Sequence, residues 1–97
     1  MKVVLASRAR QQAAAAAQWW RRNRRAAPTM FTDELRSLVS ELRRGSELGR
    51  EHDVALGIRR VLLRRSGYHV YYVSEADAVV ILAVWHTARG REPPLTR

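Results

Sequence analysis

The stretch 58–86, "IRRVLLRRSGYHVYYVSEADAVVILAVWH", decides the fold of this chain. It contains three apolar segments at 58–65, 68–74 and 78–86, separated by the short sequences "SG" and "EADA". Both separators are short enough for hairpins. The sequence therefore predicts three consecutive antiparallel strands.

The last two segments show how these strands would be placed. Side chains alternate between the two faces of a strand. One face of the middle segment would carry Tyr68, Val70 and Tyr72, and the other His69, Tyr71 and Val73. The last segment is apolar from Ala78 to Trp85, which suits a strand that is covered on both faces and placed inside the sheet.

The N-terminal part predicts a strand and then a helix. The segment 2–6 is short and contains two β-branched valines, which favours a strand. Ser7 is suited to cap the alanine-rich helix that follows. Nothing breaks this helix until Pro28, and its last turn is crowded with arginines. A shallow buried face at helical spacing would consist of Ala9, Ala13, Ala16 and Trp20.

A second helix is predicted from Thr29, and Gly45 would stop it. Its apolar stripe consists of Phe31, Leu35, Leu38, Val39 and Leu42. The short connection predicts an antiparallel helical hairpin, and the polar residues 45–57 predict a loop.

Together these elements predict one α+β domain over residues 1–97, in the order β-α-α-β-β-β. The helical hairpin would pack on a small, mainly antiparallel, twisted sheet. If the first strand joins this sheet, one face receives the helices and the other is open.

The net charge of +9 is distributed unevenly. Residues 1–27 contain Lys2, six arginines and no acidic residue, a charge of +7. Residues 28–53 carry −2 and residues 54–97 carry +4. Such an excess indicates an anionic partner, which could be a nucleic acid, an acidic protein segment or a membrane surface. A membrane-surface helix is disfavoured because alanine supplies too little apolar moment.

Several classes of protein are disfavoured by composition. The chain has no cysteine, and its three histidines lack ligand spacing, so we expect neither a disulfide framework nor a metal site, and no cofactor. The apolar run near the N-terminus is too short for a signal peptide, and the longest run is far below a membrane span. We therefore expect a soluble cytoplasmic protein.

The end of the last strand offers two interpretations of His86. Cutting RNA needs a base, cations for the phosphate and an acid, which His86 with Arg60, Arg65 and Arg89 could supply. Alternatively, His86 ends a central strand and bonds to a neighbouring turn, while Arg89 and Arg91 belong to a binding surface. An isolated histidine more often has the structural role.

Two further features indicate a contact surface. Arg59 and Arg60 would point to opposite faces of a strand, as would Arg64 and Arg65, so one of each pair would point to the helix layer and need a partner. An acidic partner segment across the groove between sheet and helices would supply carboxylates. Trp19 lies about 100° from Trp20 on the helix, which favours partial exposure.

Four short motifs carry a resemblance that extends over nearly the whole chain. They are Leu48-Gly49-Arg50, Gly57-Ile58-Arg59-Arg60, Tyr68-His69-Val70-Tyr71-Tyr72 and Val84-Trp85-His86-Thr87-Ala88-Arg89. In this order and spacing, the chain resembles the RelE/ParE superfamily of toxins from type II toxin–antitoxin systems, and within it the ParE-like plasmid stabilisation proteins. The alanine-rich first helix departs from the pattern, because it is usually more charged and leucine-rich.

The resemblance implies two mechanisms. ParE-type toxins inhibit DNA gyrase by protein contact without chemistry, whereas RelE-type toxins enter the ribosomal A site and cut mRNA. The tail "HTARGREPPLTR" resembles the ParE ending. Lysines and a terminal tyrosine that mark many of the ribonucleases are absent here.

We therefore expect a gyrase inhibitor rather than an enzyme, neutralised in a hetero-oligomer by a ParD-like antitoxin with an acidic segment. The alternative is a ribosome-dependent endoribonuclease using the four residues named above. A second alternative is a basic nucleic-acid-binding domain, although no recognition helix is visible. The expected target- or antitoxin-binding residues are Trp19, Arg59, Arg60, Arg64, Arg65, His86, Arg89 and Arg91.

Overall fold

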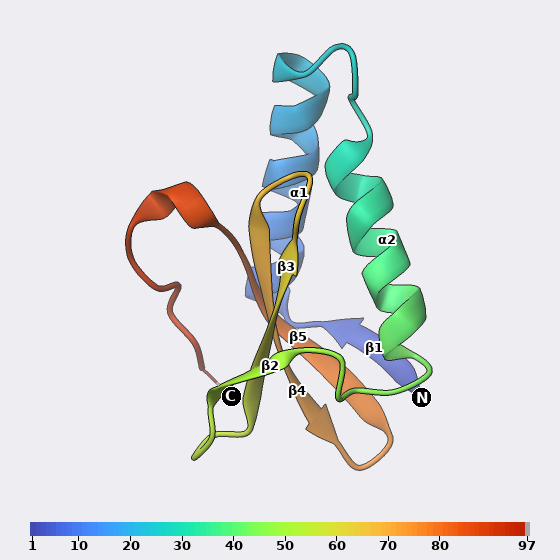
Figure 1. The fold of residues 1–97 in the computed structure, drawn as a ribbon, viewed down its shortest axis with the longest axis vertical. Helices are drawn as coiled ribbons and strands as arrows, with labels where there is room; N and C mark the ends of the chain where they lie inside the picture. Colours follow the sequence, from blue (N-terminus) through green and yellow to red (C-terminus); the bar gives the residue numbers. More distant parts are fainter. Residues whose placement is uncertain (97) are drawn as a thin grey trace.

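The computed structural model describes residues 1–96, so the last residue of the expected domain 1–97 lies outside it. The elements are β1 (Lys2–Leu5), α1 (Ser7–Asn23), α2 (Met30–Leu42), β2 (Arg50–Asp53), β3 (Ile58–Leu63), β4 (Tyr68–Glu75), β5 (Ala78–His86) and a 3-10 turn η1 (Thr87–Arg89). Figure 1 shows α1 and α2 running side by side as a hairpin beside the sheet. The predicted α+β class and helical hairpin are confirmed.

The five strands form one sheet in the order β1-β5-β4-β3-β2. β1 joins it in parallel with β5, and all other neighbours are antiparallel. The meander of β3, β4 and β5 is as predicted, and β5 lies inside the sheet between β1 and β4. An irregularity between Tyr71 and Tyr72 leaves Leu82 without an opposite residue on β4, so Leu82 and Ala83 both pack on the same face.

One strand was missed by sequence reasoning. β2 lies within the residues 45–57 that we expected to be a loop, so the observed order is β-α-α-β-β-β-β. Its sequence "REHD" is short and polar, and it pairs only with β3 through a shifted register. A charged edge strand of this kind shows no alternation of apolar and polar residues that could be recognised in the sequence. It is held in place by its pairing with β3 and not by a buried apolar face.

Several predicted boundaries were wrong. Ser7 does not cap α1, because Ala6 occupies that position while its amide donates to Ile81 O at 2.9 Å, continuing the pairing of β1. β3 ends at Leu63, so Arg64 and Arg65 lie in the turn before β4 and strand alternation does not apply to them.

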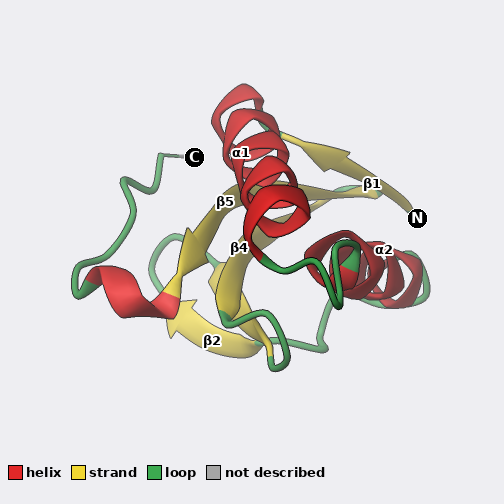
Figure 2. Cartoon of the chain, turned by 90° about the horizontal axis from the view of Figure 1, so that it is seen from above, coloured by secondary structure: helices red, strands yellow, loops and turns green. Residues whose placement is uncertain are grey.

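The helix-side core contains the predicted apolar faces. Ala9, Ala16 and Trp20 of α1 are buried, as are Phe31, Leu38 and Leu42 of α2. They pack on the sheet face that carries Tyr68, Val70 and Tyr72, as the alternation predicted. Because alanine is small, α1 approaches β5 closely, and Figure 2 shows it lying over this strand.

The opposite face of the sheet is not open as expected. A second apolar cluster there contains Tyr71, Val73 and Trp85, and Leu95 of the C-terminal tail packs against it. The tail returns after η1 (Figure 1), with Trp85 Nε1 donating to Arg91 O at 2.8 Å. Sequence reasoning left this face uncovered because no periodicity in the proline-containing tail indicates where it runs.

Candidate functional site

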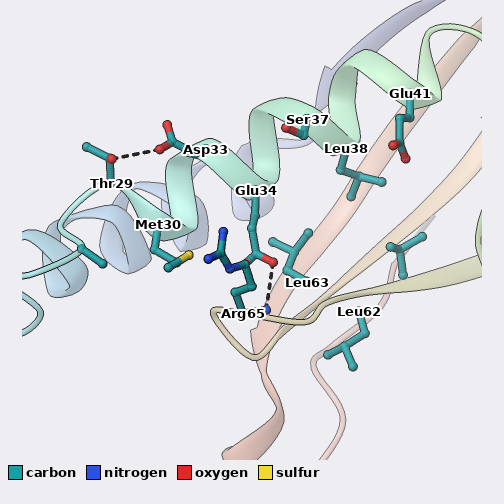
Figure 3. A pocket seen from close by; sticks show the side chains of 12 residues that line it. Thr29, Met30, Asp33, Glu34, Ser37, Leu38, Glu41, Leu62, Leu63 and Arg65 are labelled. Carbon is teal, nitrogen blue, oxygen red and sulfur yellow. Dashed lines mark hydrogen bonds between the residues drawn. The ribbon is translucent and has the colours of Figure 1, made fainter.

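The first candidate surface is a groove between α2 and the outer edge of β3, here called the α2–β3 groove (Figure 3). β2 pairs with β3 only as far as Arg60, so Val61–Leu63 have no strand on that side within residues 1–96. The hollow measures about 400 Å³. Leu62 lies at its edge with 41% of its surface exposed.

The helix wall of this groove is acidic. Asp33, Glu34 and Glu41 line it from α2, and Arg65 lines it from the strand side. Figure 3 shows Glu34 directed at the turn after β3, where its two oxygens accept hydrogen bonds from Arg65 N at 2.9 Å and Ser66 N at 2.7 Å. An acidic partner segment does not match this wall of the groove.

Arg59 finds its partners within the chain. Its guanidinium donates to Gly49 O at 2.8 Å and lies 3.9 Å from Glu51 Oε1. It shares a face of β3 with Val61, which packs on the helix-side core. The argument that such an arginine requires carboxylates from a partner therefore fails for Arg59.

The second candidate surface lies on the tail side of the sheet and is called the tail-face cleft. This shallow hollow of about 280 Å³ is lined by Arg60, His69, Tyr71, His86, Arg91 and Glu92, among others. Burial lowers the pKa of His69, and the charges of Arg60 and His52 lower it further. His69 is therefore neutral at physiological pH.

His69 and His52 were not among the expected site residues. His52 Nε2 lies 2.9 Å from Glu92 Oε1, which joins β2 to the tail. The alternation of β4 already placed His69 beside Tyr71, and that pattern could have identified it. His52 lies on β2, the strand that sequence reasoning missed.

His86 is held by contacts at the end of β5. Its Nδ1 accepts a hydrogen bond from Ala88 N at 3.1 Å, at the start of η1. Its ring meets the ring of Tyr68 edge-on at 4.8 Å. Gly67 lies so close that a Cβ there would be 3.2 Å from Nε2. These contacts orient the imidazole through the turn and a neighbouring strand.

The third candidate surface is the α1–β5 groove, a hollow of about 380 Å³. From α1 it is lined by Gln11, Gln12, Ala15, Ala16 and Trp19. From the sheet and η1 it is lined by Tyr68, Val84, His86 and Arg89. Burial raises the pKa of Tyr68, while neighbouring Trp20 and Arg89 act in the opposite direction.

Arg89 and Arg91 both lie over Trp85. The guanidinium carbons are 4.1 Å and 5.5 Å from the centre of its ring. Such cation–π contacts attract a guanidinium to the face of an aromatic ring. Both arginines are exposed and remain accessible to a partner.

The expected nuclease residues do not meet in one cleft within residues 1–96. Arg60 and His86 line the tail-face cleft, Arg89 lines the α1–β5 groove with His86, and Arg65 belongs to the α2–β3 groove. The other expected binding residues are equally dispersed. Trp19 lies on α1, Arg64 follows β3 and Arg91 borders the tail-face cleft.

Among residues 1–96, no group of three or more His, Asp and Glu side chains is placed to hold a metal ion. None of the helices in this range is long and apolar enough to cross a membrane.

A family profile described as "ParE toxin of type II toxin-antitoxin system, parDE" matches residues 3–91. This chain belongs to the ParE toxin family. The matched residues include those of all three candidate surfaces, apart from the part of the tail that follows Arg91. The resemblance read from the four sequence motifs is thereby confirmed.

A solved structure supports the ParE-like fold. It is described as "Chromosomal ParDE TA system from P. aeruginosa", and it matches with a TM-score of 0.65 at 16% sequence identity. The match covers 89% of this chain and 95% of the other. No curated protein matched. The chain is therefore a ParE toxin of a type II toxin–antitoxin system, with the fold of that family.

Proposed function

We propose that this chain inhibits DNA gyrase by direct binding and is neutralised by a ParD-like antitoxin. The observation that supports this proposal most strongly is the match to the ParE toxin family over residues 3–91. The dispersal of His86, Arg60, Arg65 and Arg89 over different surfaces agrees with a toxin that acts by contact. We propose that the chain acts in the cytoplasm together with both partners.

The antitoxin's acidic segment fits the α1 side of the molecule better than the α2–β3 groove. Residues 1–27 carry +7, whereas the α2 wall presents Asp33, Glu34 and Glu41. Complementary charge increases the rate and specificity of association. We therefore place the acidic segment on the exposed Arg21, Arg22 and Arg25 at the end of α1, outside the α1–β5 groove, and propose a hetero-oligomer. The exposed guanidinium groups of Arg89 and Arg91 contact the target.

The test is a gyrase supercoiling and DNA-cleavage assay with the purified chain, with and without the antitoxin. We expect loss of supercoiling with trapped cleaved DNA, reversed by the antitoxin. The charge reversals Arg89→Glu and Arg91→Glu should weaken inhibition, and Arg43→Glu, at the end of α2, is the matched control. An unaffected gyrase, in the presence of a folded chain that stops growth, would contradict the proposal.

A second candidate function rests on the tail-face cleft. It brings together neutral His69, Arg60 and His86, which could serve a ribosome-dependent cleavage of mRNA. This group differs from the nuclease residues expected from the sequence, because it contains His69 and lacks Arg65 and Arg89. Cleavage of ribosome-bound mRNA that is lost in His69→Gln and kept in Arg89→Gln would favour this function over gyrase inhibition.

A further inference from the structure

The α1–β5 groove exists because β1 is shorter than β5. β1 pairs only with Ala78–Ile81, so on this edge, within residues 1–96, the second half of β5 has no strand neighbour and contacts α1, while its other edge pairs with β4. Gln12 Oε1 accepts the hydrogen bond from Val84 N at 2.8 Å, a bond that a neighbouring strand would otherwise make. Ala15 and Ala16 have small side chains, so α1 protrudes little on its side of the groove. The groove is therefore open, and the amide side chains of Gln11 and Gln12 line it.

One end of this groove is aromatic. Trp19 has 45% of its surface exposed, which is unusual for so large an apolar side chain. It meets Trp20 edge-on at 5.9 Å, and the Arg24 guanidinium lies 5.5 Å from the centre of its ring. A second hollow is lined by Trp19, Arg24, Tyr68 and His86, and it shares all of these except Arg24 with the first. The exposed indole therefore borders a cavity that has a cation at its rim.

The charge of the groove is entirely positive. Among the described residues that line it, none is acidic, while Arg24 and Arg89 stand at its two sides. Arg21, Arg22 and Arg25 surround the same end of α1, and all three are exposed. The α2–β3 groove of the same molecule has the opposite character, with three carboxylates. The two grooves beside the helices therefore differ in charge.

Both arginines at the groove lie near an aromatic ring. The guanidinium carbon of Arg24 is 5.5 Å from the centre of the Trp19 ring, and that of Arg89 is 4.1 Å from the centre of the Trp85 ring. Forked guanidinium donors suit phosphate oxygens, and a cation–π contact restrains the side chain before a phosphate binds. Binding would therefore cost little additional side-chain entropy.

We propose that the α1–β5 groove binds single-stranded nucleic acid, with a base stacked on Trp19 and phosphates held by Arg24 and Arg89. An exposed aromatic ring beside guanidinium groups is how strand-binding proteins hold bases without regard to sequence. The amide side chains of Gln11 and Gln12 can donate to and accept from base edges. DNA and RNA share this chemistry.

An acidic protein segment is the competing occupant, and the observations favour it less. Carboxylates would satisfy the arginines but would not use the exposed indole face, and a docked amphipathic helix needs an apolar stripe rather than an amide floor. Binding of nucleic acid does not depend on the proposed gyrase inhibition. The binding experiment contains neither gyrase nor antitoxin, so its result can contradict nucleic-acid binding without contradicting gyrase inhibition, and the reverse also holds.

The experiment measures the anisotropy of a labelled oligothymidylate and a labelled oligouridylate of about 12 nucleotides, a usual length for such sites. We expect both to bind the wild-type chain, and any difference between them identifies DNA or RNA as the preferred source. Trp19→Ala should weaken binding at least about fivefold through loss of stacking. Arg24→Gln should reduce the salt slope by about 0.7, as for one lost phosphate contact.

Matched controls separate a site from general attraction. Leu62→Ala removes an exposed apolar side chain elsewhere, and Arg43→Gln removes the same charge at the end of α2. Arg43→Gln should reduce the salt slope less than Arg24→Gln, and Leu62→Ala should bind as the wild type does. Trp19→Phe keeps a stacking ring and should bind well, whereas Trp19→Leu should bind as weakly as Trp19→Ala. Circular dichroism checks the fold of every variant.

Two outcomes would overturn the proposal. If Trp19→Ala binds the oligonucleotides as the wild type does, their attraction is only that of a basic surface. If labelled oligoglutamate of equal charge binds as tightly and shows the same dependence on Trp19, the groove is a site for an acidic protein segment.

Discussion

The hydroxyl of Tyr72 joins β4 to the loop before β2. It accepts a hydrogen bond from Gly49 N at 2.7 Å and donates one to Ser46 O at 2.7 Å. Tyr72 is fully buried, and its burial raises the pKa of the hydroxyl. The loop that leads into the edge strand is thus anchored from the core of the sheet.

Tyr72→Phe should lower the free energy of unfolding by about 1–3 kcal/mol, because it leaves the Gly49 amide and the Ser46 carbonyl without their partner. Urea denaturation measures this difference. An unchanged midpoint would show that the loop is not held by the hydroxyl.

Gly49→Ala tests the same contact from the other side. A Cβ at this position would lie 2.8 Å from the Tyr72 hydroxyl oxygen and 3.0 Å from Arg60 O. We expect a loss of about 1–3 kcal/mol from overpacking. Tyr72→Phe removes the contact with the hydroxyl but leaves the ring carbon Cε1 at 2.9 Å. Because both single variants disturb the same hydrogen bond between Gly49 N and the Tyr72 hydroxyl, the loss in the double variant should be smaller than the sum of the two single losses. Strict additivity in urea denaturation would contradict this coupling.

The stability of the domain should fall as the pH drops below about 6.5, the ordinary pKa of histidine. The pKa of His69 is lowered in the folded chain, so the unfolded chain takes up the proton first and unfolding becomes more favourable in acid. The contribution of neutral His69 to the free energy of unfolding is fully present above the pKa that this histidine has in the unfolded chain. It is lost as the pH falls through the pKa that His69 has in the folded chain. His69→Gln should flatten this part of the curve of unfolding free energy against pH, and an unchanged slope would refute the assignment.

Glu34→Ala should cost about 1–3 kcal/mol, because it removes the acceptor of the Arg65 and Ser66 amides and releases the turn after β3 from α2. The exposed Glu47→Ala is the matched control and should change stability by less than about 0.5 kcal/mol. Glu34→Gln keeps one acceptor and should fall between them. Equal stabilities of the Glu34 and Glu47 variants would argue against this anchor.

His86→Ala should leave growth inhibition largely intact, because the imidazole is bound to the Ala88 amide at the start of η1. A stability loss of about 1 kcal/mol is expected from that hydrogen bond. Toxicity in cells and the melting temperature of the purified variant are the two measurements. Complete loss of toxicity in a variant that still folds would contradict this structural role and show that His86 takes part in toxicity itself.

The alternation of Tyr68–Val73 and the long apolar run of β5 were sufficient to predict the meander and the buried faces. Each of these elements buries apolar side chains at a regular period, and such a period can be recognised in one sequence. The motifs around Gly49 and His86 likewise led to the ParE family. The candidate site was predicted only as a set of residue types, because nothing local tells which arginines share a surface.

The sequence by itself therefore determined the order of the main elements, their apolar faces and the positive charge of the first helix. Tertiary structure alone decided that β2 pairs with β3, that the tail covers Trp85 and that Glu34 makes the α2–β3 groove acidic. The physical reason is that these features depend on partners far apart in the chain. Periodicity records which face of a segment is buried, whereas hydrogen bonds and charge pairs between distant segments exist only once the sheet has formed.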